Sequence, residues 1–215
     1  MSISNIQSSM LLKVCGLTRQ EDVLLCHDLG VDLLGFIFHE ASPRFVNPEA
    51  VAGFVQGEAL RVGVFVGQSV ARILEIKDLA SLDLIQLHGD YSPVQCRAIG
   101  PDRVIKVFWP QRYPGPDEFF RDLRRYAACC RYFLLDAGQA GGGHGQTLQT
   151  AWINKGTFAR PWFLAGGLCS KNVHNFVQQY KPDGLDMNSG VEKRPGIKDR
   201  QKLIQSRNVI KRRQA

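Results

Sequence analysis

The 215-residue sequence lacks several patterns that indicate common classes of protein. Its apolar runs are all interrupted well before the roughly 18 residues that a membrane-spanning helix needs. Its first ten residues hold no basic stretch followed by a long apolar one, so we expect no secretory signal. The six cysteines form no CxxC pair and the five histidines form no HxxxH pair, which argues against a zinc site and a disulfide framework. We therefore expect a cytoplasmic protein with reduced thiols and no membrane association.

Most of the chain has no excess of basic residues, although the formal net charge of the whole chain is +7. Residues 193–215 contain nine basic residues and one acidic residue, a net charge of +8, whereas residues 1–192 contain 18 basic and 19 acidic residues, a net charge of −1. Nucleic-acid-binding folds usually carry basic residues over a whole face. The neutral body of this chain therefore predicts no nucleic-acid partner, and the basic tail is assigned no function.

Short apolar runs alternate with helix-like stretches at intervals of roughly 20–30 residues, which is typical of strand–helix–strand units. The runs are apolar throughout, as in parallel strands covered on both faces. Eight units favour a single-domain α/β fold, a (β/α)8 TIM barrel, over an open doubly wound sheet. We expect a flexible segment over 1–10, the barrel over 11–207 and a basic tail over 208–215. The predicted strands are Leu11–Cys15, Asp32–Ile37, Arg61–Val66, Leu84–Leu87, Arg103–Phe108, Tyr132–Asp136, Trp162–Ala165 and Gly184–Met187.

Helix starts are predicted from capping residues. Thr18 and Ser92 each open a capping-box spacing, in which the hydroxyl accepts from a backbone N–H of the first helical turn. Ser69 and Ser170 precede two further helical patterns and are expected to cap them. A last helix is expected over Lys198–Ile210.

The residues that leave the strands matter most, because the active site of a parallel barrel lies at the carboxyl ends of its strands. Cys15 follows the first strand ahead of a predicted helix, whose N-terminus would favour a thiolate and suit a base or nucleophile. The alternative is a buried structural cysteine. Asp136 ends the sixth strand after apolar residues, where partial desolvation would suit a general acid; the alternative is a cap for the glycine-rich loop that follows.

Three further side chains have two interpretations each. Arg44 follows the second strand and would bind a carboxylate bidentately, or lie on the surface. His88 follows the fourth strand as a ligand contact or as a structural histidine. Asp186 on the eighth strand would either contact a ligand or form hydrogen bonds inside the barrel.

Glycines and small residues follow the last two strands, with Gly166 and Gly167 after the seventh and Asn188, Ser189 and Gly190 after the eighth. Small residues let backbone N–H groups approach an anion, and a short helix N-terminus after the eighth strand would add a favourable dipole. These two loops are the usual phosphate site of such barrels. The alternative is that they are ordinary turn glycines.

Taken together, these residues resemble the phosphoribosylanthranilate isomerase family of tryptophan biosynthesis. The similar blocks run in family order from about residue 11 to 204. They are Lys13-Val-Cys-Gly-Leu-Thr18, Leu34-Gly-Phe-Ile-Phe38, Ser42-Pro-Arg44, Val62-Gly-Val-Phe65, Gln86-Leu-His-Gly-Asp90, Leu134-Leu-Asp136, Leu164-Ala-Gly-Gly-Leu168, Ser189-Gly-Val-Glu192 and Pro195-Gly-Ile-Lys-Asp199.

The resemblance implies an Amadori rearrangement of the aminoaldose N-(5-phosphoribosyl)anthranilate to the 1-deoxyribulose 5-phosphate derivative. Asp136 matches the family's general acid, Cys15 its general base, and Arg44 the residue that holds the anthranilate carboxylate. No metal or organic cofactor is implied, because the imine intermediate is itself the electron sink. A monomer or homodimer acting on a small phosphorylated substrate is expected. Substrate contacts are expected from Gln86, His88 and Asp186, and phosphate contacts from Gly166, Gly167, Asn188, Ser189 and Gly190.

The chain departs from the family after the sixth strand. The family's loop has Lys where this chain has Gln146, and Phe-Asp where it has Leu148 and Gln149. One alternative is the sister isomerase of histidine biosynthesis, which uses aspartates after strands 1 and 5; Cys15 and Trp109 stand there instead. The other alternative is a barrel that has lost catalysis and serves as a binding module.

Overall fold

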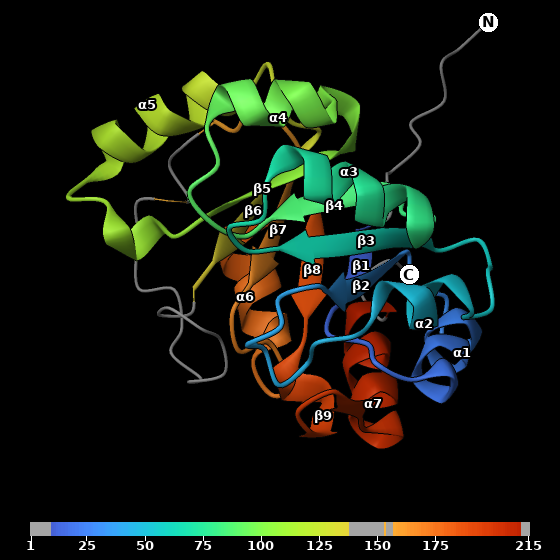
Figure 1. Cartoon of the computed structure of the whole chain (residues 1–215). Helices are drawn as coiled ribbons and strands as arrows, with labels where there is room; N and C mark the ends of the chain where they lie inside the picture. The colour runs from blue at the N-terminus through green and yellow to red at the C-terminus, as the bar shows by residue number, and fades with distance from the viewer. Residues whose placement is uncertain (1–9, 138–152, 154–156, 212–215) are drawn as a thin grey trace, which may run out of the picture.

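The computed structural model describes residues 10–137, 153 and 157–211. Strands form a central ring and helices surround it (Figure 1). The strands of the ring are β1 (Leu11–Val14), β2 (Leu33–Ile37), β3 (Leu60–Phe65), β4 (Leu84–Leu87), β5 (Val104–Phe108), β6 (Tyr132–Asp136), β7 (Trp162–Ala165) and β8 (Gly184–Met187). The helices are α1 (Gln20–Asp28), α2 (Pro48–Ala52), α3 (Val70–Leu79), α4 (Pro93–Ile99), α5 (Pro116–Tyr126), α6 (Val173–Tyr180) and α7 (Arg200–Lys211). Shorter elements are the 3-10 turns η1 (Pro101–Arg103), η2 (Pro110–Arg112) and η4 (Ser189–Val191) and the strands β9 (Glu192–Arg194) and β10 (Ile197–Lys198).

Three predicted features lie largely outside the described residues. They are the N-terminal segment before Met10, the loop that contains Gln146, Leu148 and Gln149, and residues 212–215 of the basic tail. α7 extends to Lys211, beyond the predicted barrel boundary at residue 207.

Strands β1 to β8 pair in sequence order as a closed parallel barrel. The ring closes where β1 pairs with β8, with Leu11 opposite Gly184 and Val14 opposite Met187. The predicted (β/α)8 TIM barrel is confirmed. β4, β6, β7 and β8 have the predicted bounds, β1, β2 and β5 differ by one residue at one end, and β3 is shifted by one residue at both ends.

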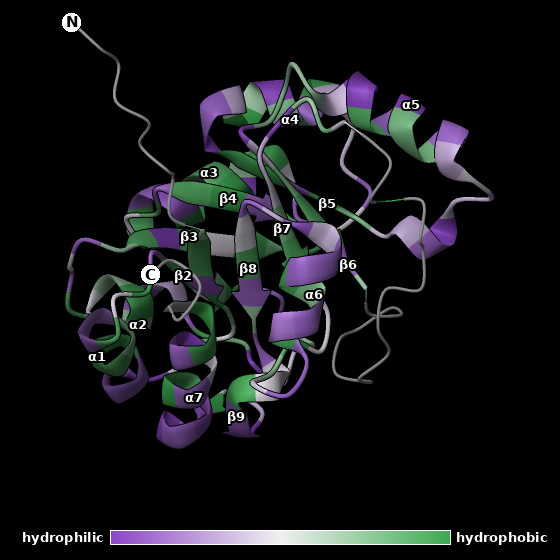
Figure 2. Cartoon of the chain, turned by 180° about the vertical axis from the view of Figure 1, so that it is seen from behind, coloured by the Kyte–Doolittle hydropathy of each residue, from purple (hydrophilic) through white to green (hydrophobic). Residues whose placement is uncertain are grey.

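The barrel strands are apolar on both faces because each face packs against a different core. Alternate side chains point inward, where Leu33, Val62, Leu134 and Phe163 fill the barrel. The other side chains point outward and form a larger core with the helices. Figure 2 shows the result, with hydrophobic strands inside helices whose outer faces are hydrophilic. This two-sided burial explains why the strand sequences do not alternate with polar residues.

Two of the four predicted helix caps are confirmed. Ser92 forms a capping box with Gln95 at the start of α4, and Ser69 caps α3. The Thr18 prediction is wrong, because α1 begins at Gln20 and the Thr18 hydroxyl instead donates to the carbonyl of Gly196, at 2.6 Å. The Ser170 prediction is also wrong, because Asn172 stands at the N-cap of α6.

The chain between β8 and α7 forms a small antiparallel pair of strands, β9 and β10. The predicted final helix therefore begins at Arg200 rather than at Lys198, which lies in β10. The carboxylate of Asp199 caps α7 by accepting from the backbone N–H groups of Gln201 and Lys202, at 2.9 and 3.1 Å. No helix in the described part of the chain is long and apolar enough to cross a membrane.

Candidate active site

Most of the predicted site residues gather at the carboxyl end of the barrel. Parallel pairing brings the strand ends together, so Cys15 after β1, His88 after β4 and Asp136 at the end of β6 border the same opening. Side chains two residues apart along a strand point to the same side. Each of these three residues follows an inward-facing residue of its strand at such a spacing, so all three point inward. Residues far apart in sequence therefore share one mouth.

Cys15 lies at the base of this mouth and is 4% exposed. Its backbone N–H donates to the carbonyl of Met187, at 2.8 Å, which fixes it against β8. Burial raises the pKa of the thiol above its ordinary value, and the charge of Lys13 opposes that shift. The helix that follows Cys15, α1, begins at Gln20, and an effect of its N-terminus on the thiol stays a prediction.

Asp136 faces His88 across the opening, with 4.0 Å between Oδ2 and Nε2. The His88 ring packs edge-on against Trp109, with 5.0 Å between ring centres. Burial and the charges of Lys13 and Lys106 lower the pKa of His88 to about 4. The imidazole is therefore neutral at pH 7 and can donate or accept a hydrogen bond without carrying charge. Trp109, which stands where the sister isomerase has an aspartate, forms one wall of this mouth.

Arg44 is neither a free surface arginine nor an unoccupied carboxylate site. Its guanidinium binds Glu192 in a fork, with Nε 3.0 Å from Oε1 and Nη2 2.8 Å from Oε2. Glu192 is 5% exposed and also accepts from Lys198 Nζ, at 2.8 Å. Glu192 and Lys198 were not predicted as partners of Arg44. Both lie in the blocks similar to the family, and that similarity was the available signal.

The loops after β7 and β8 contact each other directly. A methyl group on Gly190 would lie 2.0 Å from the carbonyl oxygen of Leu168, so only glycine fits. Gly166 has φ of 103°, a conformation that side chains rarely adopt. Ser189–Val191 form a short 3-10 helix after β8, where a short helix was expected, and the Asn188 amide oxygen accepts from Lys198, at 3.0 Å. The two glycine-rich loops therefore form one continuous rim.

Gln86 and Asp186 lie deeper, inside the barrel below the mouth. Gln86 is 2% exposed, and among the described residues its Oε1 atom has no hydrogen-bond partner. Asp186 forms an ion pair with Lys13, at 2.9 Å, so its observed contact is the one expected for a hydrogen bond within the barrel. A substrate contact from either residue stays a prediction.

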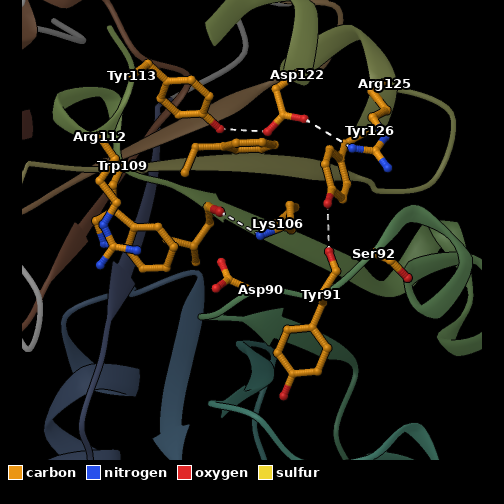
Figure 3. A pocket seen from close by; sticks show the side chains of 12 residues that line it. Asp90, Tyr91, Ser92, Lys106, Trp109, Arg112, Tyr113, Asp122, Arg125 and Tyr126 are labelled. Atoms are coloured by element: carbon orange, nitrogen blue, oxygen red, sulfur yellow. Dashed lines mark hydrogen bonds and ion pairs between the residues drawn. The ribbon is translucent and has the colours of Figure 1, made fainter. Parts of the chain in front are cut away.

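A cavity of about 380 Å³ lies elsewhere, outside the barrel between β5 and α5 (Figure 3). Its floor holds Lys106, whose ammonium donates to the carbonyls of Gly89 and Val107, both at 2.9 Å, and lies over the ring of Phe108. Burial lowers the pKa of Lys106. These contacts satisfy the ammonium within the fold. Trp109 borders both this cavity and the barrel mouth, whereas none of the residues predicted for the active site lines the cavity.

Comparison with known proteins decides the family. The family model described as N-(5'-phosphoribosyl)anthranilate (PRA) isomerase matches residues 12–209. The chain belongs to the phosphoribosylanthranilate isomerase family. The isomerase of Maridesulfovibrio salexigens is 46% identical over 195 residues, which cover 91% of this chain and 95% of that protein.

Solved structures of phosphoribosylanthranilate isomerases have the same fold. The Thermus thermophilus enzyme is 34% identical with a TM-score of 0.81, and the match covers 94% of this chain and 99% of that one. Another solved isomerase, 29% identical with a TM-score of 0.78 and 94% and 98% coverage, is in complex with reduced 1-(o-carboxyphenylamino)-1-deoxyribulose 5-phosphate. The family resemblance predicted from the sequence is confirmed.

Proposed function

We propose that this chain catalyses the Amadori rearrangement of N-(5-phosphoribosyl)anthranilate, with Asp136 as general acid and Cys15 as general base. The observation that carries the proposal is that both side chains stand at the carboxyl ends of strands in one closed barrel. The glycine-rich loops after β7 and β8 border the same opening and would bind the phosphate through backbone N–H groups. Family membership supplies the reaction.

The proposed reaction needs one proton donor and one proton acceptor. Asp136 gives a proton to the furanose ring oxygen, the bond from that oxygen to C1 breaks, and the nitrogen lone pair forms an imine. Cys15, as a thiolate, takes the proton from C2, and the C2–H electrons move into the imine to give an enolamine. C1 then gains a proton and the C2 hydroxyl loses one, which forms the ketose carbonyl. The ring oxygen and C1 have gained one proton each and C2 and its hydroxyl have lost one each, so the reaction is a balanced isomerisation. The neutral ring of His88 lies 4.0 Å from Asp136, too far for a direct hydrogen bond, and forms the neighbouring wall of the site.

Arg44 contributes to this function through its remaining N–H groups. Glu192 already accepts from Nε and Nη2, so the substrate carboxylate would bind the free edge of the guanidinium. A guanidinium has five N–H groups, and two of its nitrogens are engaged here. Glu192 and Lys198 therefore orient Arg44 for this contact.

The test is turnover of fluorescent phosphoribosylanthranilate by purified variants. Cys15→Ser and Asp136→Asn are each expected to lower kcat by about 100-fold or more while the circular dichroism spectrum is retained, since acid–base groups contribute roughly that much. The matched control is Asp102→Asn, an exposed carboxylate ahead of β5 at the opposite end of the barrel, which should keep kcat within about twofold. Near-normal turnover by Cys15→Ser or Asp136→Asn would remove that residue from the mechanism.

The aminoaldose substrate of the sister isomerase in histidine biosynthesis is the comparison substrate. β5 is followed by Trp109, which is 8% exposed and packs on His88, rather than by a carboxylate. We expect no turnover of that aminoaldose. Turnover of it without turnover of phosphoribosylanthranilate would reject the proposed function.

A further inference from the structure

A fully buried ion pair lies in the barrel directly below Cys15. Lys13 is 0% exposed and its Nζ is 2.9 Å from Oδ1 of Asp186. Lys13 and Cys15 stand two residues apart along β1, so their side chains point to the same, inward side. Asp186 faces Lys13 in the register between β1 and β8. The pair is therefore held next to the thiol by strand pairing.

Gly35 on β2 shows how closely the thiol and the ammonium approach. A methyl group at Gly35 would lie 2.9 Å from Cys15 Sγ and 3.0 Å from Lys13 Nζ, so both atoms border the same small space. The positive charge of Lys13 acts on the thiol and lowers its pKa against the effect of burial. The absence of a side chain at Gly35 thus leaves the room in which sulfur and nitrogen meet.

Core stability does not explain the pair. Moving an ammonium and a carboxylate out of water is costly, and well-packed apolar residues of similar volume often serve as well or better. Other inward positions of this barrel hold such residues, for example Val62, Leu134 and Phe163. An ion pair at this place therefore points to an electrostatic role.

The charges around the thiol show what that role is. The charged side chains with the largest effect on Cys15 are Lys13 on β1, Asp186 on β8 and Lys198 on β10. The two lysines favour the thiolate and Asp186 opposes it. The pKa of Lys13 itself is raised: burial alone would lower it, but the carboxylate of Asp186 outweighs burial and keeps the ammonium charged.

We propose that Lys13 is a positioning residue for Cys15, whose ammonium holds and stabilises the thiolate form of the base, while Asp186 anchors that ammonium. The inference rests on the proposed role of Cys15 as the base. In each turnover the thiolate takes the C2 proton and becomes a neutral thiol, and Lys13 stays protonated throughout. The ammonium thus compensates the negative charge that burial would otherwise exclude.

The test is the pH titration of Cys15, followed by thiolate ultraviolet absorbance as the difference between each protein and its Cys15→Ser counterpart. Lys13→Met should move the midpoint up by about one pH unit or more, because the nearest cation is lost. Asp186→Asn should also move it up, because without this carboxylate burial lowers the pKa of Lys13 and the ammonium charge beside the thiol is lost. Upward shifts are not expected from a purely structural pair, whose loss would let water reach the thiol and move the midpoint down.

Each single variant leaves a buried charge without its partner, so a double variant guards against misfolding. Lys13→Met/Asp186→Leu replaces the pair by apolar residues, which proteins often tolerate. We expect it to fold, to raise the Cys15 midpoint above that of the unaltered protein and to lower kcat by about tenfold or more. Glu75→Leu, which breaks the exposed pair between Arg72 and Glu75, is the control and should leave the midpoint unchanged.

The outcomes separate this inference from the proposed function. If Cys15→Ser abolishes turnover but the folded double variant titrates like the unaltered protein, Lys13 has no part in holding the thiolate and the inference fails alone. If Cys15→Ser retains turnover, the proposed base is wrong whatever the titrations show. A midpoint that rises in both Lys13→Met and Asp186→Asn and accompanies loss of kcat supports both.

Discussion

At the scale of single residues, the surroundings of a side chain at the barrel mouth determine what it can do. Cys15 has the chemistry of a base only if a positive charge offsets its burial, and Lys13 is the nearest one. His88 is held neutral by burial and by the same lysine. One buried ammonium therefore influences two titratable groups of opposite kind, which links their protonation states.

The depressed pKa of His88 predicts a pH dependence of stability. The folded protein takes up the His88 proton only near pH 4, whereas the unfolded chain takes it up near 6.5. Between these values the unfolded chain binds more protons, so the stabilising contribution is lost as pH falls from about 6.5 towards 4. At about pH 5 the loss should approach roughly 2 kcal/mol.

Urea unfolding at about pH 7.5 and pH 5 measures this effect. His88→Phe should lose less free energy of unfolding between the two pH values than the unaltered protein does. His174→Gln, a change to an exposed histidine on α6, is the control and should lose as much as the unaltered protein. Equal losses for all three proteins would contradict the prediction.

At the scale of elements, the β9–β10 pair forms a rigid support behind the mouth. It places Glu192 between Arg44 and Lys198, two cations that come from opposite ends of the chain. The pKa of Glu192 is lowered: burial alone would raise it, but hydrogen bonds from Arg44 and Lys198 outweigh burial. The carboxylate therefore stays charged and joins the loop after β2 to the segment after β8.

Glu192→Leu is expected to destabilise the protein strongly. It leaves Lys198, which is 2% exposed, without its carboxylate, and breaking a buried pair from one side costs about 3–5 kcal/mol. The free energy of unfolding in urea measures the loss. Glu75→Leu breaks an exposed ion pair of α3 and should change it by less than about 1 kcal/mol. If both variants lost a similar free energy of unfolding, the buried ion pairs would contribute no more to stability than the exposed one.

A substitution at Gly190 is expected to displace the two glycine-rich loops together. Gly190→Ala forces a methyl group against the backbone carbonyl of Leu168, which cannot move aside like a flexible side chain. Displacing the rim should raise KM for the phosphorylated substrate by about tenfold or more, since small misplacements cost this much. Gly115→Ala, where the nearest atom would be 3.5 Å away, should leave KM within about twofold. An unchanged KM in Gly190→Ala would separate the loops from phosphate binding.

At the scale of the whole molecule, the basic charge begins where the rim formed by the two glycine-rich loops ends. Lys193, Arg194 and Arg200 are exposed and follow the loop after β8, while residues 1–192 carry a net charge of −1. The positive charge therefore extends from the active end of the barrel along α7. An anionic substrate would be drawn toward that end.

Substrate capture should then depend on salt. Lys193→Gln/Arg194→Gln is expected to lower kcat/KM several-fold at low ionic strength and to have little effect at about 0.3 M salt, because screening removes the attraction. The control is Arg97→Gln/Arg103→Gln, the same charge change at exposed positions before β5, at the opposite end of the barrel. Steady-state assays over a range of salt concentrations measure both. The same salt dependence in both double variants would refute steering.

Local patterns in the sequence were sufficient for the barrel. Eight apolar runs gave strand bounds correct to within one residue, because burial on both faces depends on short segments that the sequence displays directly. The cap at Ser92 followed from neighbouring residues for the same reason. The Thr18 cap was wrong because its hydroxyl has a better partner in Gly196, which sequence spacing does not reveal.

The sequence by itself determined the barrel, the family and the chemical types gathered at its mouth. The tertiary structure alone decided the partnerships: Arg44 with Glu192, Lys13 with Asp186 beside Cys15, and His88 with Asp136 and Trp109. The physical reason is that strand identity depends on local periodicity, whereas a hydrogen bond or ion pair depends on distances between residues from different strands. Closing the ring between β1 and β8 sets those distances.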